Sequence, residues 1–107
     1  MSVRPATRVG DNANCPSDSH SKGCCDHNVT GPAVSGSPNV RINGRPALRI
    51  GDTGVHSKCC GPNTWENIEG SSKVFINNIP AVRLHDATRH CGGIGKMIEG
   101  SHDIFFE

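Results

Sequence analysis

The sequence predicts an all-β fold, a small cone in which three β repeats surround a pseudo-threefold axis. Two phrases, each present three times in 107 residues, predict it. The opening phrase reads RPATRVGD, RPALRIGD and IPAVRLHD at Arg4–Asp11, Arg45–Asp52 and Ile79–Asp86. The closing phrase reads GSPNVRIN, GSSKVFIN and GSHDIFFE at Gly36–Asn43, Gly70–Asn77 and Gly100–Glu107. Such self-similarity is typical of repeat proteins, whose units cannot bury their apolar faces alone.

The composition also favours strands over helices. Thirteen glycines and seven prolines interrupt the chain every few residues, so no stretch keeps helical apolar spacing over the length of a helix. Valine, isoleucine, leucine and phenylalanine number only 21, so the core is small. We expect one domain, 1–107, made of repeat units 4–43, 44–77 and 78–107.

Charge and hydropathy exclude several classes of protein. The formal net charge is +1, and 11 basic residues are scattered among 10 acidic ones, so we expect no nucleic-acid partner. The N-terminus lacks the apolar segment of a signal peptide, and no apolar run approaches the roughly 18 residues of a membrane span. We therefore expect a soluble protein that does not use the signal-peptide route.

Each unit is expected to run from an opening strand through a variable loop to a closing strand. A proline begins each opening strand, where its fixed φ and missing N–H donor suit a first position or a sheet edge. In the closing segments apolar residues alternate with other residues, which predicts strands with one buried face. The six side chains expected in the core are Val40, Ile42, Val74, Ile76, Ile104 and Phe106.

Two dipeptides predict how consecutive units connect. Asn43-Gly44 and Asn77-Asn78 are tight-turn pairs that fold a closing strand back against the next opening strand. An open array of repeats is the alternative to a closed ring. Three units without a divergent cap favour closure.

The residue four positions after each opening Asp predicts a metal site near the apex. These residues are Cys15, His56 and His90, which converge if a threefold axis relates the units. A structural zinc site takes four ligands, and His20 in the longest loop is the expected fourth. Thiolate and imidazole suit Zn²⁺ better than Ca²⁺ or Mg²⁺, and iron is the second candidate. One closed structural site leaves no open position for catalysis, so we expect no enzyme and no catalytic residue.

Other residues in the same loops leave alternatives open. A second aligned set has three interpretations: small packing residues near the axis, a disulfide ring, or substitutes for one of the four ligands. These rival residues at the ends of the loops are Cys24, Cys25, His27, Cys59, Cys60 and Cys91. The adjacent His90 and Cys91 are not expected to form a catalytic pair, because sequence neighbours on a strand point apart. The repeated Asp and Arg of the opening phrase predict ion pairs and capped turns.

The opening and closing phrases resemble the PAAR-repeat family, named for its Pro-Ala-Ala-Arg motif. The resemblance covers nearly the whole chain, although Thr7, Leu48 and Val82 replace the second Ala and His85 replaces the last Gly. It implies a small β cone with a metal ion bound near its point by Cys and His from the loops. The family's ligand position falls on Cys15, His56 and His90, and its Cys-Pro-x-x-x-His pattern falls on Cys15 to His20.

The resemblance also implies a function. Similar proteins sit on the end of a trimeric β-helical spike, VgrG-like or of the phage type, in type VI secretion systems and phage-like contractile tails. We expect a monomeric, metal-stabilised cap that sharpens the spike for membrane puncture and can carry separate effector proteins. It would be made in the bacterial cytoplasm and delivered with the spike or virion. The alternative is a free-standing structural module, held by metal or disulfides, without a spike partner.

Overall fold

The computed structural model describes residues 3–18, 27–56, 64–90 and 93–107, and all regular structure in these ranges is β-strand. The strands are β1 Arg4–Pro5, β2 Asn12–Asp18, β3 His27–Pro32, β4 Arg41–Ile42, β5 Arg45–Pro46, β6 Thr53–Val55, β7 Thr64–Asn67, β8 Phe75–Ile76, β9 Ile79–Pro80, β10 Ala87–His90, β11 Ile94–Met97 and β12 Phe105–Phe106. The all-β prediction is confirmed. None of the described segments forms a helix long and apolar enough to span a membrane.

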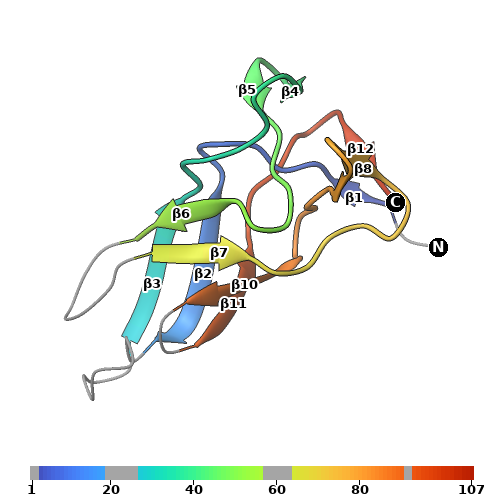
Figure 1. The fold of residues 1–107 in the computed structure, drawn as a ribbon. Helices are drawn as coiled ribbons and strands as arrows, with labels where there is room; N and C mark the ends of the chain where they lie inside the picture. Colours follow the sequence, from blue (N-terminus) through green and yellow to red (C-terminus); the bar gives the residue numbers. More distant parts are fainter. Residues whose placement is uncertain (1–2, 19–26, 57–63, 91–92) are drawn as a thin grey trace.

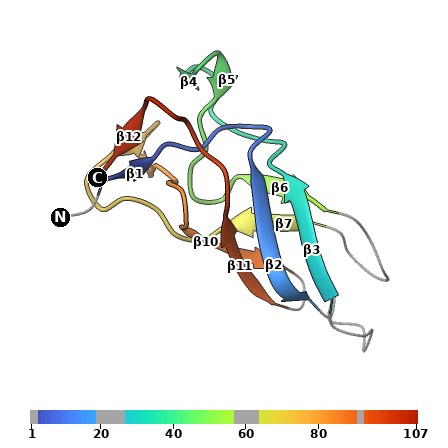
Figure 2. The same ribbon diagram turned by 180° about the vertical axis from the view of Figure 1, so that it is seen from behind.

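The strands divide into a larger sheet and three small ones (Figures 1 and 2). The larger sheet has six antiparallel strands in the order β3-β2-β11-β10-β7-β6. A bridge between Ala33 and Gly54 joins its two edges, so the sheet is a nearly closed barrel. The two-stranded sheets β12–β1, β4–β5 and β8–β9 spread apart at the opposite end, which we call the base.

Between barrel and base, the opening segments close into a ring around the pseudo-threefold axis. We call the segments 6–8, 47–49 and 81–83 the central ring. Three isolated antiparallel bridges run from each unit to the next: Arg8 to Ala47, Arg49 to Ala81 and Arg83 to Ala6. Three main-chain bonds follow the same cycle: Leu48 N–H to Thr7 O at 3.2 Å, Val82 N–H to Leu48 O at 3.1 Å and Thr7 N–H to Val82 O at 3.3 Å. The repeats therefore close, and the open array is excluded.

The turns that join the units fall at the predicted dipeptides, and their residues adopt left-handed backbone geometry. Asn43 and Gly44 have φ values of 54° and 80°, and Asn77 and Asn78 have 56° and 65°. Positive φ at both central residues is the geometry of a two-residue β-hairpin. The third two-stranded sheet of the base has no connecting turn, because it pairs the two ends of the chain. Its strands β1 and β12 pair through Arg4 with Phe106 and Pro5 with Phe105.

The strands of the barrel occupy the segments that the sequence analysis expects to be variable loops. In each repeat the chain leaves the opening Asp as one strand and returns as another, giving β2 and β3, β6 and β7, and β10 and β11. These strands carry few Val and Ile residues, so their apolar alternation is weak. Main-chain bonds between units hold them: Val34 N–H to Thr53 O, Ile68 N–H to Ala87 O and Ile98 N–H to Asn12 O.

The hydrophobic core has two parts, separated by the central ring. The barrel part contains Ala13, Ala33, Leu48, Trp65, Val82 and Met97, and the base part contains Ala6, Ile42, Ala47, Ile76 and Ala81. Of the six side chains expected in the core, Ile42 and Ile76 are buried, whereas Val40, Val74 and Phe106 are only half-buried. The expectation is wrong for Ile104, which is 39% exposed. The closing strands reach only the base, so the larger core side chains Trp65 and Met97 come from the barrel.

Candidate metal centre

Three corresponding positions on the returning strands bring each unit against the candidate ligand of the next. These positions are Gly31, Trp65 and Gly95, which pair with Ala13, Gly54 and Thr88. A Cβ on Gly31 would lie 2.5 Å from Cα of His56, and a Cβ on Gly95 would lie 2.9 Å from Cα of Cys15. In the same cyclic order, Trp65 pairs with His90 across β7 and β10. The fold therefore puts one candidate ligand at each junction between units.

All three candidate ligands in the described ranges are withdrawn from solvent. Cys15 is fully buried, and His56 and His90 are 7% and 4% exposed. The two imidazole rings stack with centroids 5.2 Å apart and planes inclined by 27°. Burial of polar rings in a small domain requires compensating interactions, and one is visible at His90. Its Nε2 lies 3.0 Å from Oγ1 of Thr88.

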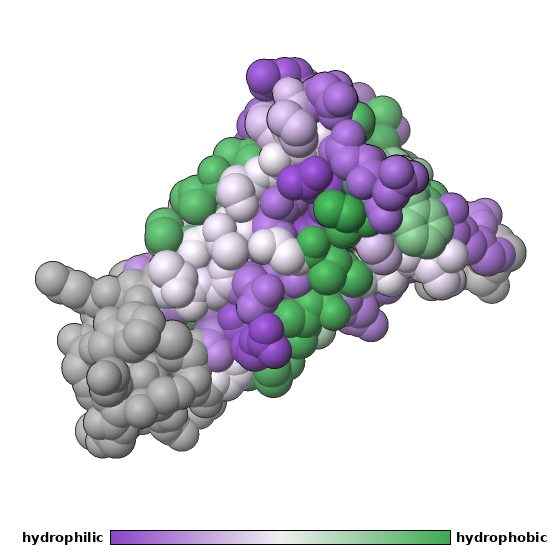
Figure 3. Space-filling view, in the orientation of Figure 1, coloured by the Kyte–Doolittle hydropathy of each residue, from purple (hydrophilic) through white to green (hydrophobic). Residues whose placement is uncertain are grey.

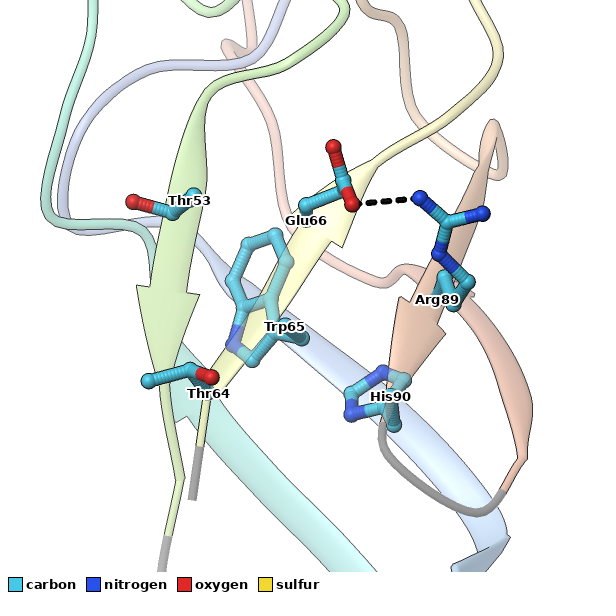
Figure 4. A pocket seen from close by; sticks show the side chains of 6 residues that line it. All are labelled: Thr53, Thr64, Trp65, Glu66, Arg89 and His90. Atoms are coloured by element: carbon cyan, nitrogen blue, oxygen red, sulfur yellow. Dashed lines mark hydrogen bonds and ion pairs between the residues drawn. The ribbon is translucent and has the colours of Figure 1, made fainter. Parts of the chain in front are cut away.

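Trp65 forms the wall beside His90 (Figure 4). The indole and imidazole centroids are 6.0 Å apart. On its other side the indole crosses Gly54, where a Cβ would lie only 2.2 Å from Cε2 and Cζ2. The indole N–H donates to the carbonyl of Val55 at 3.2 Å. These contacts fix the indole in the barrel and limit the space open to the His90 ring.

The donor set is compatible with zinc, but the structure describes only part of it. With Zn–N distances of about 2.0–2.1 Å, two imidazoles on one tetrahedral ion have centroids roughly 5 Å apart, near the separation of His56 and His90. In the described part of the chain, no group of three or more His, Cys, Asp or Glu side chains is close enough to hold a metal ion. The fourth expected ligand, His20, lies outside the described residues, as do Cys24, Cys25, Cys59, Cys60 and Cys91. The structure thus brings His56 and His90 together, and the four-ligand set stays a prediction.

Below the barrel, the three opening phrases form the predicted ion pairs and capped turns. In each phrase the main-chain N–H and the guanidinium of the Arg both donate to the Asp three residues later. The three pairs are Arg8 with Asp11, Arg49 with Asp52 and Arg83 with Asp86. The hydrogen bond to the Asp raises the pKa of each Arg, against the opposing effect of burial.

Two of these carboxylates also receive an Arg from a neighbouring unit. Arg45 donates to Asp11 at 3.2 Å, and Arg4 donates to Asp86 at 2.8 Å. The corresponding residue at the third junction, beside Asp52, is Ile79. The ring of ion pairs is therefore complete at two junctions and reduced at one.

The opening phrases end in a left-handed turn residue in all three units. Gly10 and Gly51 have φ values of 95° and 96°, and His85 has 72° in the same position. A non-glycine residue is uncommon there, so tertiary contacts must hold His85 in place. Its main-chain N–H donates to the carbonyl of Met97, as Gly10 donates to Ala33.

A shallow hollow of about 330 Å³ opens beside the candidate centre. It is lined by Thr53, Thr64, Trp65, Glu66, Arg89 and His90 (Figure 4). Its charged residues, Glu66 and Arg89, form an ion pair with each other.

The repeated phrases agree with a comparison against known families. A model of the PAAR motif matches residues 2–61 and 27–96, which together span most of the chain. The chain belongs to the PAAR-motif family. Members of this family are structural components at the spike tips of contractile injection systems. No curated protein matches the chain.

Proposed function

We propose that this PAAR protein caps the trimeric spike of a contractile injection machine, either a type VI secretion system or a phage-like tail. The observation that carries the proposal is the family match over residues 2–61 and 27–96, in a chain whose three repeats close on themselves. A cap with three similar faces can make comparable contacts with each chain of a trimer.

The base has the properties of the docking surface. Its three two-stranded sheets leave short strand edges that can pair with strands of a β-helical spike. Phe75 and Phe105 occupy corresponding positions there and are 55% and 51% exposed. The corresponding residue on β4 is Arg41, and hydrophilic side chains cover the β4–β5 hairpin at the top of Figure 3. Two apolar contacts and one polar contact would thus face the spike.

A structural metal ion would stabilise the opposite end. Cys15, His20, His56 and His90 are its proposed ligands, with Zn²⁺ the preferred ion. Such an ion cross-links loops from all three units and supplies folding energy that a chain with only 21 Val, Ile, Leu and Phe residues lacks. A stiff apex would aid membrane puncture.

The test is co-purification of the chain with its trimeric spike protein, combined with metal analysis. We expect one cap per trimer and one zinc ion per chain. Phe75→Ala and Phe105→Ala should weaken the complex, whereas Thr53→Ala on the barrel should not. A spike that excludes the cap would overturn the capping role.

The same preparation tests the metal role. Complete chelation should lower the melting temperature markedly, because the ion stabilises only the folded chain. An unchanged transition, together with three disulfides on thiol counting in denaturant, would favour the free-standing module instead.

A further inference from the structure

We propose that Thr88 is a positioning residue of the metal centre, which holds His90 through Nε2 and leaves Nδ1 as the atom that binds the ion. This inference rests on the metal site in the proposed function and goes further, because it assigns the ligand atom and the residue that selects it.

The first step is the geometry of β10. Thr88 and His90 are two residues apart on this strand, so both side chains point to the same face. Thr88 is fully buried and His90 nearly so, and Oγ1 lies 3.0 Å from Nε2. Thr88 is β-branched and therefore has few χ1 rotamers, so its hydroxyl is held in place. The main chain on both sides is fixed, since Thr88 pairs with Gly95 on β11 and with Asn67 on β7.

The second step is the protonation of the ring. A metal-bound histidine is a neutral imidazole that offers one nitrogen lone pair to the ion and carries its proton on the other nitrogen. With Nε2 beside the hydroxyl, its N–H can donate to Oγ1 of Thr88, and the lone pair then lies on Nδ1. A hydrogen bond from the remote nitrogen is the usual device that orients a ligating histidine.

The third step is the lack of freedom in the ring itself. The indole of Trp65 lies along one side of His90 and the imidazole of His56 stacks on it, with centroids at 6.0 and 5.2 Å. A 180° flip of the ring, which exchanges Nδ1 with Cδ2 and Nε2 with Cε1, would place a carbon opposite the hydroxyl of Thr88 and break this bond. Holding His90 also restrains His56, because the two rings are in contact.

Thr88 has no counterpart in the other repeats. The corresponding residues are Ala13 and Gly54, neither of which carries a polar side chain. Among the three repeats, therefore, a hydroxyl two residues before the candidate ligand is present in the third, where Thr88 precedes His90.

The experiment compares Thr88→Val, Thr88→Ser and the wild type by nitrogen NMR of the histidine rings and by zinc competition against a chelator. In the metal-free wild type at a pH where His90 is neutral, we expect its proton on Nε2. With zinc added, the Nδ1 resonance should take the shift of a metal-bound nitrogen. Thr88→Val should mix the two tautomers and weaken zinc binding about tenfold, whereas Thr88→Ser, which keeps the hydroxyl, should stay within about twofold of the wild type.

Thr7→Val is the matched control. Thr7 is equally buried and its hydroxyl donates to the carbonyl of Val82 at 2.8 Å, but it lies in the central ring. This variant should lose stability while it keeps the wild-type zinc affinity and the His90 tautomer.

The outcomes separate this inference from the metal proposal. Zinc bound through Nε2 of His90, seen in the wild type without any substitution, overturns the inference and leaves the metal site standing. So does a Thr88→Val protein with unchanged affinity and tautomer. A wild type that binds no metal overturns both the proposed site and the assigned ligand atom.

Discussion

The central ring and the barrel interior differ in how closely they follow the threefold symmetry. In the ring, Thr7, Leu48 and Val82 make equivalent main-chain hydrogen bonds of 3.1–3.3 Å although their side chains differ. In the barrel, the corresponding residues on the returning strands are Gly31, Trp65 and Gly95. The first region repeats one arrangement three times, and the second does not.

The difference follows from what each region must satisfy. Main-chain donors and acceptors are the same in every residue type except proline, so a ring built from them tolerates Thr, Leu or Val. Side chains of the barrel core pack against one another, and the one indole among them, that of Trp65, has Gly31 and Gly95 at the corresponding positions of the other units. The symmetry is therefore kept where backbones meet and broken where side chains converge.

The largest expected effect comes from filling a glycine position in the barrel. A Cβ on Gly31 would lie 1.9 Å from the carbonyl oxygen of Val55, and backbone on both sides leaves it no room. We expect Gly31→Ala to cost about 4 kcal/mol or more, which is severe overpacking. Urea unfolding measures it.

Gly51→Ala is the matched control for the ring side. Gly51 has a φ of 96° but nothing within 4 Å of its virtual Cβ, so only the backbone conformation is penalised, by about 1–2 kcal/mol. Equal losses of unfolding free energy in the two variants would show that close packing around Gly31 adds nothing to the cost of the substitution.

A smaller effect separates the ion pairs of the three units. Asp86 accepts from Arg83 and Arg4 and its side chain is fully buried, whereas Asp52 accepts from no Arg but Arg49 among the described residues and is 9% exposed. We expect Asp86→Asn to cost about 3 kcal/mol and Asp52→Asn about 2 kcal/mol, because charged hydrogen bonds are lost in both. Urea unfolding of the two variants at neutral pH tests whether Asp86→Asn loses more stability than Asp52→Asn. If the ion pairs of the units were equivalent, the two losses would be equal.

A substitution at Ile79 should supply Asp52 with the second Arg contact that Asp11 and Asp86 already have. Ile79→Arg supplies the third junction with the residue that Arg4 and Arg45 provide at the other two. We expect a gain of at most about 1 kcal/mol, because the corresponding Arg45 side chain is 42% exposed and solvent weakens such pairs. In an Asp52→Asn background the gain should vanish, and a gain that persists there would have another origin.

The ion pairs of the opening phrases and the turns between units could be predicted from the sequence, because both depend on local features. The Asp–Arg pairs lie three residues apart, and the turn at Asn43-Gly44 is set by two residues. The barrel depends on contacts between units, which an apolar pattern does not record. The strand that carries Trp65 has only one large apolar residue in TWEN, and the burial of Asn67 on the same face is visible only in the structure.

Three candidate ligands were chosen by the same kind of local counting, and their role as ligands stays a prediction. The spacing of four residues after each Asp selects Cys15, His56 and His90, all of which are buried. The role of Thr88 could not be found this way, since no other unit repeats it. Ile104 fails as a core residue because the period of a strand tells which residues share a face, not how far along the strand that face stays covered.

The smallest expected effect concerns the base, where the three junctions use different chemistry at one position. Asn77 donates its amide to Asn39 at 2.8 Å, and Asn43 donates to Asp103 at 2.9 Å. At the third junction Lys73 pairs with Glu107 at 3.6 Å. The first of these contacts joins two neutral amides, whereas the second joins an amide to a carboxylate.

Asp103 provides a pH test of this difference. The amide of Asn43, and then the hydroxyl of Ser101, lower the pKa of Asp103 below its ordinary value of 3.8. Since the folded pKa is the lower one, the carboxylate contributes its full stabilisation above about pH 4, and loses it as the pH falls through the folded pKa. Asp103→Asn copies the contact of Asn39, so the stability difference between this variant and the wild type should shrink toward zero in acid.

Unfolding curves of both proteins between about pH 7 and about pH 2 measure that difference, and the other carboxylates cancel because the two proteins share them. Asn39→Asp is the reciprocal variant and should acquire the acid dependence that Asp103→Asn loses. A difference that stays constant with pH would mean that the neutral and charged contacts are equivalent. The base would then follow the symmetry of the central ring instead of departing from it as the barrel does.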